Sequence, residues 1–173
     1  MKFFYNFNQR ILNAKIVCQN YNDIHDLSLK ASTYCIKGSS IDESRFYPIN
    51  NQLNETPVIN FLFVSRIIKE KGVFELINGF NMATVLTTKK INLNIVGWFD
   101  KNNPNSISED DLQNIISKNK RINFIGKSDK VDQLISKTHI GILPTYYREG
   151  TPRFLLECMA MEKTIITTKV PGC

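Results

Sequence analysis

The sequence predicts an α/β fold built on a Rossmann-like parallel sheet. Three observations indicate it: short apolar runs that alternate with helical segments, glycines at the ends of several of those runs, and regular spacing of this pattern from residue 58 onward. Strands that alternate with helices form βαβ units, and right-handed crossovers join them into a parallel sheet. Such a sheet binds its ligand at the carboxyl ends of its strands.

The elements follow one another in strict alternation. We expect strands over 58–65, 91–97, 121–126, 138–144 and 163–167, and helices over 70–86, 107–119, 130–136 and 150–161. The first part of the chain is less regular, with a strand over 14–19, a helix over 22–31, a short strand over 34–37 and a polar linker over 38–56. We therefore expect two domains: 1–50 as the remnant of a first domain plus a hinge, and 51–173 as a Rossmann-like domain that lacks its last part.

Composition narrows the class of protein. The 173 residues are 42% hydrophobic and carry a formal net charge of +6. No apolar run approaches the ~20 residues that cross a bilayer, and the N-terminus lacks a secretory signal pattern, so we expect a cytoplasmic protein. The four cysteines have neither paired spacing nor histidine neighbours, which favours reduced thiols over a metal site. The positive charge is compatible with a solvated surface, a nucleotide diphosphate or an acidic membrane face, whereas no nucleic-acid-reading motif accompanies it.

The segment 144–161 holds the strongest chemical signal. Glu149 and Glu157 are eight residues apart, Gly150 follows the first of them, and Pro152 is expected within the first helical turn. A helix N-terminus presents free N–H groups that suit phosphate, and carboxylates accept hydrogen bonds from sugar hydroxyls. Over eight helical residues, or ~12 Å, the two carboxylates would grip separated parts of an elongated ligand.

These residues resemble the C-terminal domain of family 4 glycosyltransferases, the group 1 glycosyltransferases. The E-x7-E pattern of Glu149 and Glu157 is the hallmark of that family, and 164–173 (TIITTKVPGC) is similar to its following strand and turn. Residues 64–72 (VSRIIKEKG) are similar to its "GR…KG" element, although Ser65 replaces the usual glycine. The strand ends before Gly97 and Gly126 and the hinge over 38–48, in which Ser40 replaces a glycine, agree in order and spacing.

The resemblance implies a fold, a reaction and a set of residues. The fold is the C-terminal half of a two-domain B-type glycosyltransferase, here truncated at both ends, and the reaction is retaining, metal-independent transfer from a nucleotide diphosphate sugar such as a UDP-sugar, with no cofactor. Arg66 and Lys71 would bind the diphosphate, and Glu149 would hold the hexose with the Gly150 and Thr151 N–H groups near phosphate. Glu157 would hold the ribose, and Gly126 and Lys127 would lie near the base. The implied catalytic set is Glu149, Arg66 and Lys71.

The acceptor and the setting are less defined by the residues. An acceptor sugar or lipid-linked sugar is expected, in capsule, lipopolysaccharide or glycolipid synthesis, with peripheral association at the inner face of the cell membrane compatible with the charge. The 173-residue chain by itself is expected to bind donor weakly and not to turn over. Two alternatives remain: a non-catalytic Rossmann-like binding module or degenerate remnant, and another nucleotide-sugar enzyme such as an epimerase.

Overall fold

The computed structural model describes residues 14–26, 28, 33–36, 38–49 and 57–173. These fall into two compact units. The larger, here called the sheet unit, comprises Ile41–Tyr147 and Phe154–Thr168. The smaller unit comprises Met1–Ser40, Arg148–Arg153 and Lys169–Cys173.

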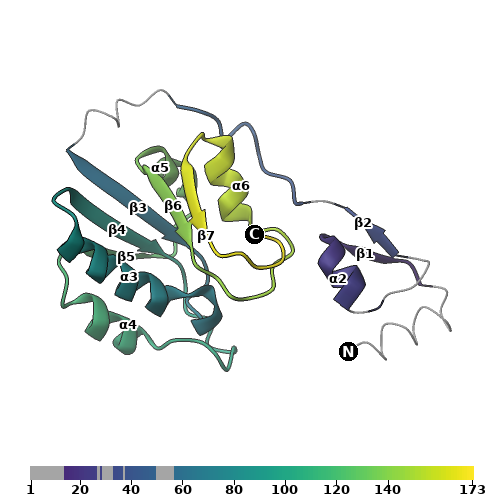
Figure 1. Cartoon of the computed structure of the whole chain (residues 1–173), viewed down its shortest axis with the longest axis horizontal. Helices are drawn as coiled ribbons and strands as arrows, with labels where there is room; N and C mark the ends of the chain where they lie inside the picture. Colours follow the sequence, from purple (N-terminus) through teal and green to yellow (C-terminus); the bar gives the residue numbers. More distant parts are fainter. Residues whose placement is uncertain (1–13, 27, 29–32, 37, 50–56) are drawn as a thin grey trace. The chain divides into compact units, whose positions relative to one another are not determined.

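The sheet unit is built on five parallel strands in the order β5-β4-β3-β6-β7 (Figure 1). The strands are β3 (Val58–Val64), β4 (Lys90–Val96), β5 (Ile122–Gly126), β6 (Ile140–Leu143) and β7 (Thr164–Thr167). All five strands predicted from the sequence are present, each within two residues of its expected bounds. The α/β fold with a parallel sheet is therefore confirmed.

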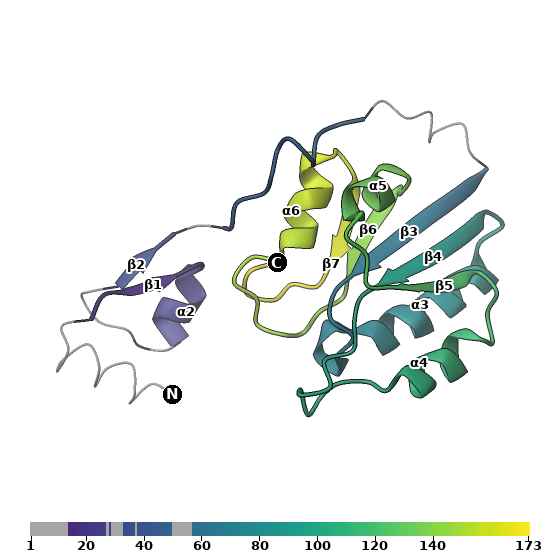
Figure 2. The same ribbon diagram turned by 180° about the vertical axis from the view of Figure 1, so that it is seen from behind.

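Helices cover both faces of this sheet. Helices α3 (Val73–Leu86) and α4 (Glu109–Ile116) lie on one face, and α5 (Val131–Ser136) and α6 (Arg153–Ala160) lie on the other (Figures 1 and 2). This division follows from the strand order, because β3 to β5 proceed in one direction across the sheet and β6 and β7 in the other. The sheet interior is apolar, and Leu62, Phe63, Leu93 and Ile95 are fully buried. Each such side chain contributes roughly 1.5–3 kcal/mol by leaving water.

Two predicted helix starts were wrong, and each has a local cause. A helix over 70–86 was expected, but a 3-10 turn η2 (Lys69–Lys71) precedes α3, because Gly72 between them has a φ of 74°. That left-handed conformation interrupts a right-handed helix. The helix expected from residue 107 begins at Glu109, since the Ser108 side chain accepts a hydrogen bond from the Asp111 amide at 3.1 Å and caps it.

The third correction concerns the segment with the strongest signal. The helix expected over 150–161 begins only at Arg153, so Glu149, Gly150 and Thr151 lie in a loop and Pro152 precedes the helix. A residue before proline is disfavoured in the helical conformation, which excludes Thr151 from the helix. The ~12 Å helical span expected between the two glutamates is therefore wrong, because only Glu157 is on α6.

The smaller unit contains a two-stranded parallel sheet. Strand β1 (Ile16–Cys18) pairs with β2 (Thr33–Cys35), and helix α2 (Tyr21–Asp26) lies between them in sequence. The expected strand, helix and strand are present, but the helix predicted over 22–31 ends at Asp26, because Ser28 lies in a turn with a φ of 51°. Residues 27, 29–32 and 37 lie outside the described residues. The linker predicted over 38–56 has neither helix nor strand over 38–49, and 50–56 lie outside the description. The domain boundary after residue 50 stays a prediction.

Candidate functional site

The strand order reverses between β3 and β6. These two strands are neighbours in the sheet, yet the chain leaves β3 toward β4 and β5 and leaves β6 toward β7. Parallel α/β sheets form a crevice at such a point, outside the carboxyl ends of the strands, and bind ligands there. The turns that follow β3 and β6 are therefore the first place to look for a site.

The turn after β3 carries Arg66. Backbone hydrogen bonds hold this turn to the next strand end, from the Ser65 amide to the Val96 carbonyl at 3.1 Å and from the Ile67 amide to the Trp98 carbonyl at 2.9 Å. The Arg66 guanidinium forms an ion pair with Asp100 at 3.2 Å, and about a third of its side chain is exposed (34%). A guanidinium has five N–H donors, so one carboxylate leaves others for an anion.

Lys71 lies five residues after Arg66, at the end of the 3-10 turn η2, and is buried, with 8% of its surface exposed. Its ammonium nitrogen lies 5.3 Å from the centre of the Tyr147 ring, within the range of a cation–π contact. The backbone brings the two together, because Gly72 lies directly against the Pro144 carbonyl at the end of β6. The chain after β3 therefore carries two positively charged side chains, Arg66 and Lys71, at the carboxyl end of the strand.

A single carbonyl oxygen joins the two turns. The Glu70 carbonyl accepts hydrogen bonds from the Tyr146 amide at 2.9 Å, from the Tyr147 amide at 3.2 Å and from the Thr145 hydroxyl at 3.1 Å. Thr145 is fully buried, and its hydroxyl also accepts from the Tyr147 amide at 3.1 Å. The turn after β3 and the turn after β6 therefore form one hydrogen-bonded structure.

Glu157 lies in the second turn of α6 and is buried, with 7% of its surface exposed. Its neighbours Leu155 and Cys158 are also buried, whereas Met159 on the same helix is exposed. A buried carboxylate is stable only where charged or hydrogen-bonding groups face it. The charge of Glu157 contributes to a raised pKa of the Arg45 guanidinium, whose largest cause is its hydrogen bond with Asp132.

Gly126 ends β5, where its carbonyl accepts a hydrogen bond from the Gly97 amide at 3.0 Å, and Lys127 after it is exposed. The loop that follows is anchored by Arg45, which lies in the segment before β3. The Arg45 guanidinium donates to the Asp129 carbonyl and to the Asp132 carboxylate, both at 2.8 Å. This hydrogen bond lowers the pKa of Asp132 below its ordinary value.

The predicted residues thus divide between the two units. Arg66, Lys71, Gly126, Lys127 and Glu157 belong to the sheet unit, whereas Glu149, Gly150 and Thr151 belong to the smaller unit. The prediction that Glu149 and Glu157 grip one ligand therefore stays a prediction.

Within the smaller unit, the loop of Glu149 is held by backbone contacts. The Glu149 amide donates to the Pro171 carbonyl at 3.3 Å, and its carbonyl accepts from the Asn20 side chain at 3.3 Å. Gly150 lies against the Gln19 side chain, and a methyl group at this glycine would overlap it. The close approach expected of this glycine is thus made, in this structure, to a protein side chain.

Sequence reasoning missed three contributors to this site: Asp100, Tyr147 and Arg45. Asp100 follows the glycine-ended second strand by three residues, so a search of that loop for charges was the available signal. Tyr147 precedes the E-x7-E segment by two residues. Arg45 had no local signal, because its partner Asp132 is 87 residues away in sequence.

Within the part of the chain that the structure describes, no group of three or more His, Cys, Asp or Glu side chains is placed to hold a metal ion. Among the same residues, no helix has the length and apolar character required to span a membrane.

Comparison with known proteins places the chain in a family. The family model described as "Glycosyl transferases group 1" matches residues 45–173. A Campylobacter jejuni relative, N,N'-diacetylbacillosaminyl-diphospho-undecaprenol alpha-1,3-N-acetylgalactosaminyltransferase, is 28% identical over 167 residues, which are 89% of this chain and 41% of that protein. The Staphylococcus aureus capsular polysaccharide biosynthesis glycosyltransferase CapM is 30% identical over 120 residues, 69% of this chain and 30% of its own.

A solved structure agrees in fold. The crystal structure of Anabaena HepE in complex with UDP and glucose superposes with a TM-score of 0.76 at 16% identity and covers 99% of this chain and 48% of its own. The chain thus spans less than half the length of each of these proteins. Since the family model covers most of the chain, the chain belongs to the group 1 glycosyl transferases.

Proposed function

We propose that this chain binds a nucleoside diphosphate sugar in the crevice outside β3 and β6, as the donor-binding half of a retaining, metal-independent glycosyltransferase. The observation that carries the proposal is the pair of cations on the turn after β3. Lys71 is buried and Arg66 is two-thirds covered. Cations held in this way at a strand-order reversal are suited to a diphosphate.

The two cations account for the chemistry of the leaving group. In the transfer, the bond from the anomeric carbon of the sugar to the diphosphate breaks, and the diphosphate keeps the electron pair. An acceptor hydroxyl forms the new bond to the same carbon on the same face and loses its proton. Arg66 and Lys71 stabilise the negative charge that grows on the diphosphate, and this electrostatic stabilisation lowers the barrier without requiring a metal ion.

The carboxylates and glycines complete the proposed donor site. Glu157 accepts hydrogen bonds from the ribose hydroxyls, and Glu149 accepts them from the transferred hexose. The amides of Gly150 and Thr151 lie near phosphate. Gly126 and Lys127 contact the base, and Arg45 holds the loop that follows them through Asp129 and Asp132.

The relatives suggest the setting. The name of the Campylobacter protein specifies transfer to a diphospho-undecaprenol-linked sugar, CapM acts in capsular polysaccharide synthesis, and the Anabaena structure contains UDP. We therefore propose a UDP-sugar as donor, a lipid-linked sugar as acceptor, and synthesis of bacterial surface polysaccharide or glycolipid at the cytoplasmic face of the membrane. The 173-residue chain is proposed to bind donor without transferring it.

Titration of the chain with UDP by isothermal calorimetry tests the donor site. Arg66→Ala and Glu157→Ala each remove a charged hydrogen-bonding group, so we expect Kd to rise roughly 10- to 100-fold. Arg121→Ala and Glu162→Ala are matched controls, since both residues are exposed and lie before the amino ends of β5 and β7, at the edge of the sheet opposite the crevice. Equal UDP affinity in all four variants and the parent chain would remove the site assignment.

The stereochemistry and the metal requirement need a turning-over enzyme. A chimera in which residues 45–173 of this chain replace the matching segment of the Campylobacter relative supplies one. Product whose anomeric proton coupling matches that of the donor supports retention, and unchanged turnover with excess EDTA supports metal independence. An inverted product, or loss of turnover that Mg²⁺ restores, contradicts the corresponding part of the proposal. Transfer by the 173-residue chain alone would contradict its proposed role.

A further inference from the structure

The amino ends of the strands, opposite the proposed donor site, carry an exposed apolar ridge. Met82, Val85 and Leu86 lie on the last turn and a half of α3, with 66%, 84% and 81% of their surfaces exposed. Residues three and four apart share one face of a helix, so the three side chains form one surface. The preceding residues of this helix bury Leu76, Ile77 and Phe80 against the sheet, which shows that the helix changes character toward its end.

Five exposed cations lie in the segments next to this ridge. Lys89 and Lys90 follow α3 and begin β4, while Lys118, Lys120 and Arg121 lie between α4 and β5, and all five are exposed. The two segments are held together. The Asn119 side chain donates to the Asn81 side chain of α3 at 2.7 Å.

The strand pairing adds a second link. The Leu93 amide donates to the Arg121 carbonyl at 2.9 Å, which brings the start of β4 beside the residues before β5. We call the apolar ridge and these five cations the amino-edge patch.

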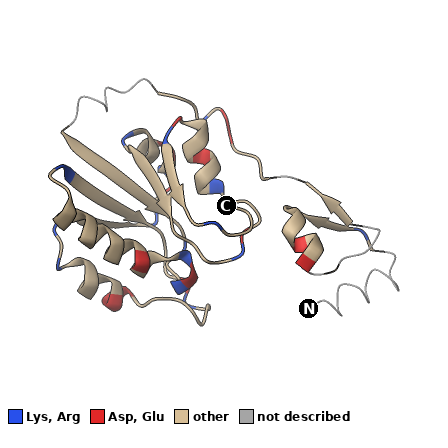
Figure 3. Ribbon diagram, in the orientation of Figure 1, with Lys and Arg blue, Asp and Glu red and all other residues tan. Residues whose placement is uncertain are grey.

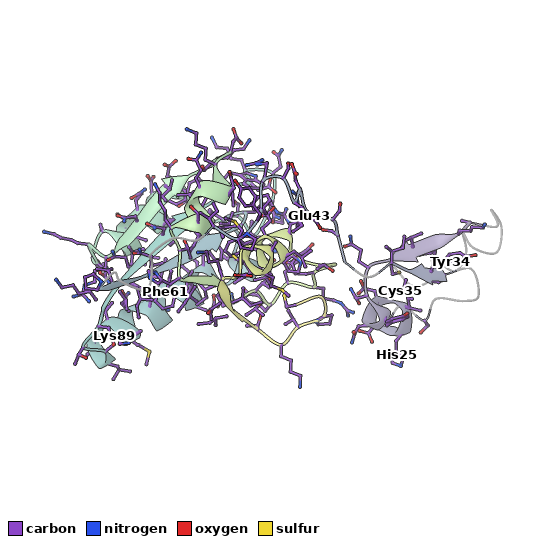
Figure 4. All side chains as sticks on the ribbon, turned by 90° about the horizontal axis from the view of Figure 1, so that it is seen from above. His25, Tyr34, Cys35, Glu43, Phe61 and Lys89 are labelled. Carbon is purple, nitrogen blue, oxygen red and sulfur yellow. The ribbon has the colours of Figure 1, made fainter. Side chains whose placement is uncertain are left out.

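Carboxylates are absent from the same stretches of sequence. Residues 76–99 and 112–128 contain no Asp or Glu. The acidic residues of these helices lie in their first turns, with Glu75 on α3 and Glu109, Asp110 and Asp111 on α4, at the opposite edge of the sheet. Figure 3 shows blue but no red where α3 ends and β4 begins, and in Figure 4 Lys89 points outward from the ribbon there.

Favourable interaction with helix dipoles explains cations near the ends of α3 and α4 but not the apolar side chains among them. A nucleic acid would neutralise the charge of the cations but would leave Val85 and Leu86 in water. The surface of an anionic bilayer can neutralise the cations and also bury the apolar side chains. Phospholipid head groups attract the cations, Lys side chains extend toward them, and the apolar ridge enters the boundary with the acyl chains.

We propose that the amino-edge patch docks this chain on an anionic lipid bilayer. The inference deepens the proposed function, because a lipid-linked acceptor would give the docking a purpose. Binding to lipid requires neither nucleotide nor acceptor, however, so the two proposals can fail separately. The docking is peripheral, since only side chains of one helix end and its flanking cations take part.

Vesicle flotation of the full chain tests the inference. The probes are vesicles of phosphatidylcholine alone and vesicles with 30% phosphatidylglycerol. We expect flotation with the anionic vesicles only, and release in 0.5 M NaCl, because salt screens the attraction. Each surface-bound lysine strengthens binding about fivefold, so Lys89→Ser with Lys90→Ser should weaken it roughly 25-fold. Leu86→Ser should weaken it roughly tenfold through lost apolar contact.

Lys101→Ser with Lys130→Ser is the matched control, since it removes the same charge from exposed positions outside the patch. Circular dichroism establishes that each variant is folded, and UDP titration of the Lys89/Lys90 variant should be unchanged. Three results would overturn the proposal: no flotation with anionic vesicles, equal loss in the control variant, or sedimentation showing that Leu86→Ser instead dissociates a dimer. If the chain floats with anionic vesicles but does not bind UDP, only the donor-site proposal is contradicted.

Discussion

Gly72 joins the fold to the proposed site, and its replacement by alanine tests that link. The residue has a φ of 74°, and an added methyl group would meet the Pro144 carbonyl oxygen. An alanine in the left-handed conformation is strained by about 1–2 kcal/mol, and overpacking adds about 1–3 kcal/mol. Gly72→Ala should therefore lower the free energy of unfolding by about 2–5 kcal/mol, a large part of the ~5–15 kcal/mol typical of a domain.

Gly79, within the helix α3 that begins directly after Gly72, provides the matched control. It is exposed, a methyl group there meets nothing within 4 Å, and its backbone is helical. Gly79→Ala should raise the free energy of unfolding by about 0.5–1 kcal/mol, because alanine favours the helix. Urea denaturation followed by circular dichroism measures both. With a slope of about 2 kcal/mol per molar urea, the Gly72 midpoint should fall by about 1–2.5 M and the Gly79 midpoint should rise by about 0.3–0.5 M.

The same variant should report on the site. Alanine at position 72 displaces the turn that holds Lys71 over Tyr147, so UDP affinity should fall in the folded protein, whereas Gly79→Ala should bind UDP as the parent does. A Gly72→Ala protein with the parent's urea midpoint would refute the packing argument. A destabilised variant with undiminished UDP affinity would refute the link between this turn and the ligand.

Other outcomes follow from burial. Lys71→Ala should weaken UDP binding in calorimetry roughly 10- to 100-fold, because it removes a buried ammonium group. Lys69→Ala removes an exposed cation on the same turn and should change UDP binding little. Equal effects of the two substitutions would contradict the role of the Lys71 ammonium group. Burial raises the pKa of the Cys158 thiol to about 12, so this thiol stays protonated at pH 8 and should resist alkylation by iodoacetamide. The exposed Cys173 should be alkylated. Mass spectrometry of tryptic peptides measures the alkylation of each cysteine.

The pKa of Cys158 also fixes the sign of one pH effect. Since the folded thiol holds its proton more tightly than the unfolded one, its contribution to stability is complete below the ordinary pKa of 9.0 and is lost as pH rises toward 12. Urea midpoints measured from pH 8 to 10.5 should fall for the parent chain, and Cys158→Ala should show a shallower decline. The same decline in both would contradict this assignment.

The sequence predicted the sheet well because each strand carries its own apolar pattern. All five strands and the alternation with helices could be placed from local residues. Helix starts were less predictable. The left-handed Gly72 and the position of Arg153 after Pro152 are conformational choices that apolar periodicity does not record.

The pairing of side chains from distant segments could not be predicted from the local sequence pattern. The contact of Arg66 with Asp100 spans 34 residues and that of Arg45 with Asp132 spans 87. Which of several charges meet depends on how the strand ends are stacked, and that is known only once the sheet is assembled. The placement of Glu149 in a unit apart from Glu157 had no sequence signal at all.

The Glu70 carbonyl, with its three donors, has a consequence for how the crevice moves. The amides of Tyr146 and Tyr147 can exchange with solvent deuterium only when both turns separate, so the two probes should share one opening event. A shift of the segment after β6 must then carry the backbone of Lys71 with it. The turn after β3 and the turn after β6 would therefore move together as one rigid segment, and the Lys71 ammonium group would move with them.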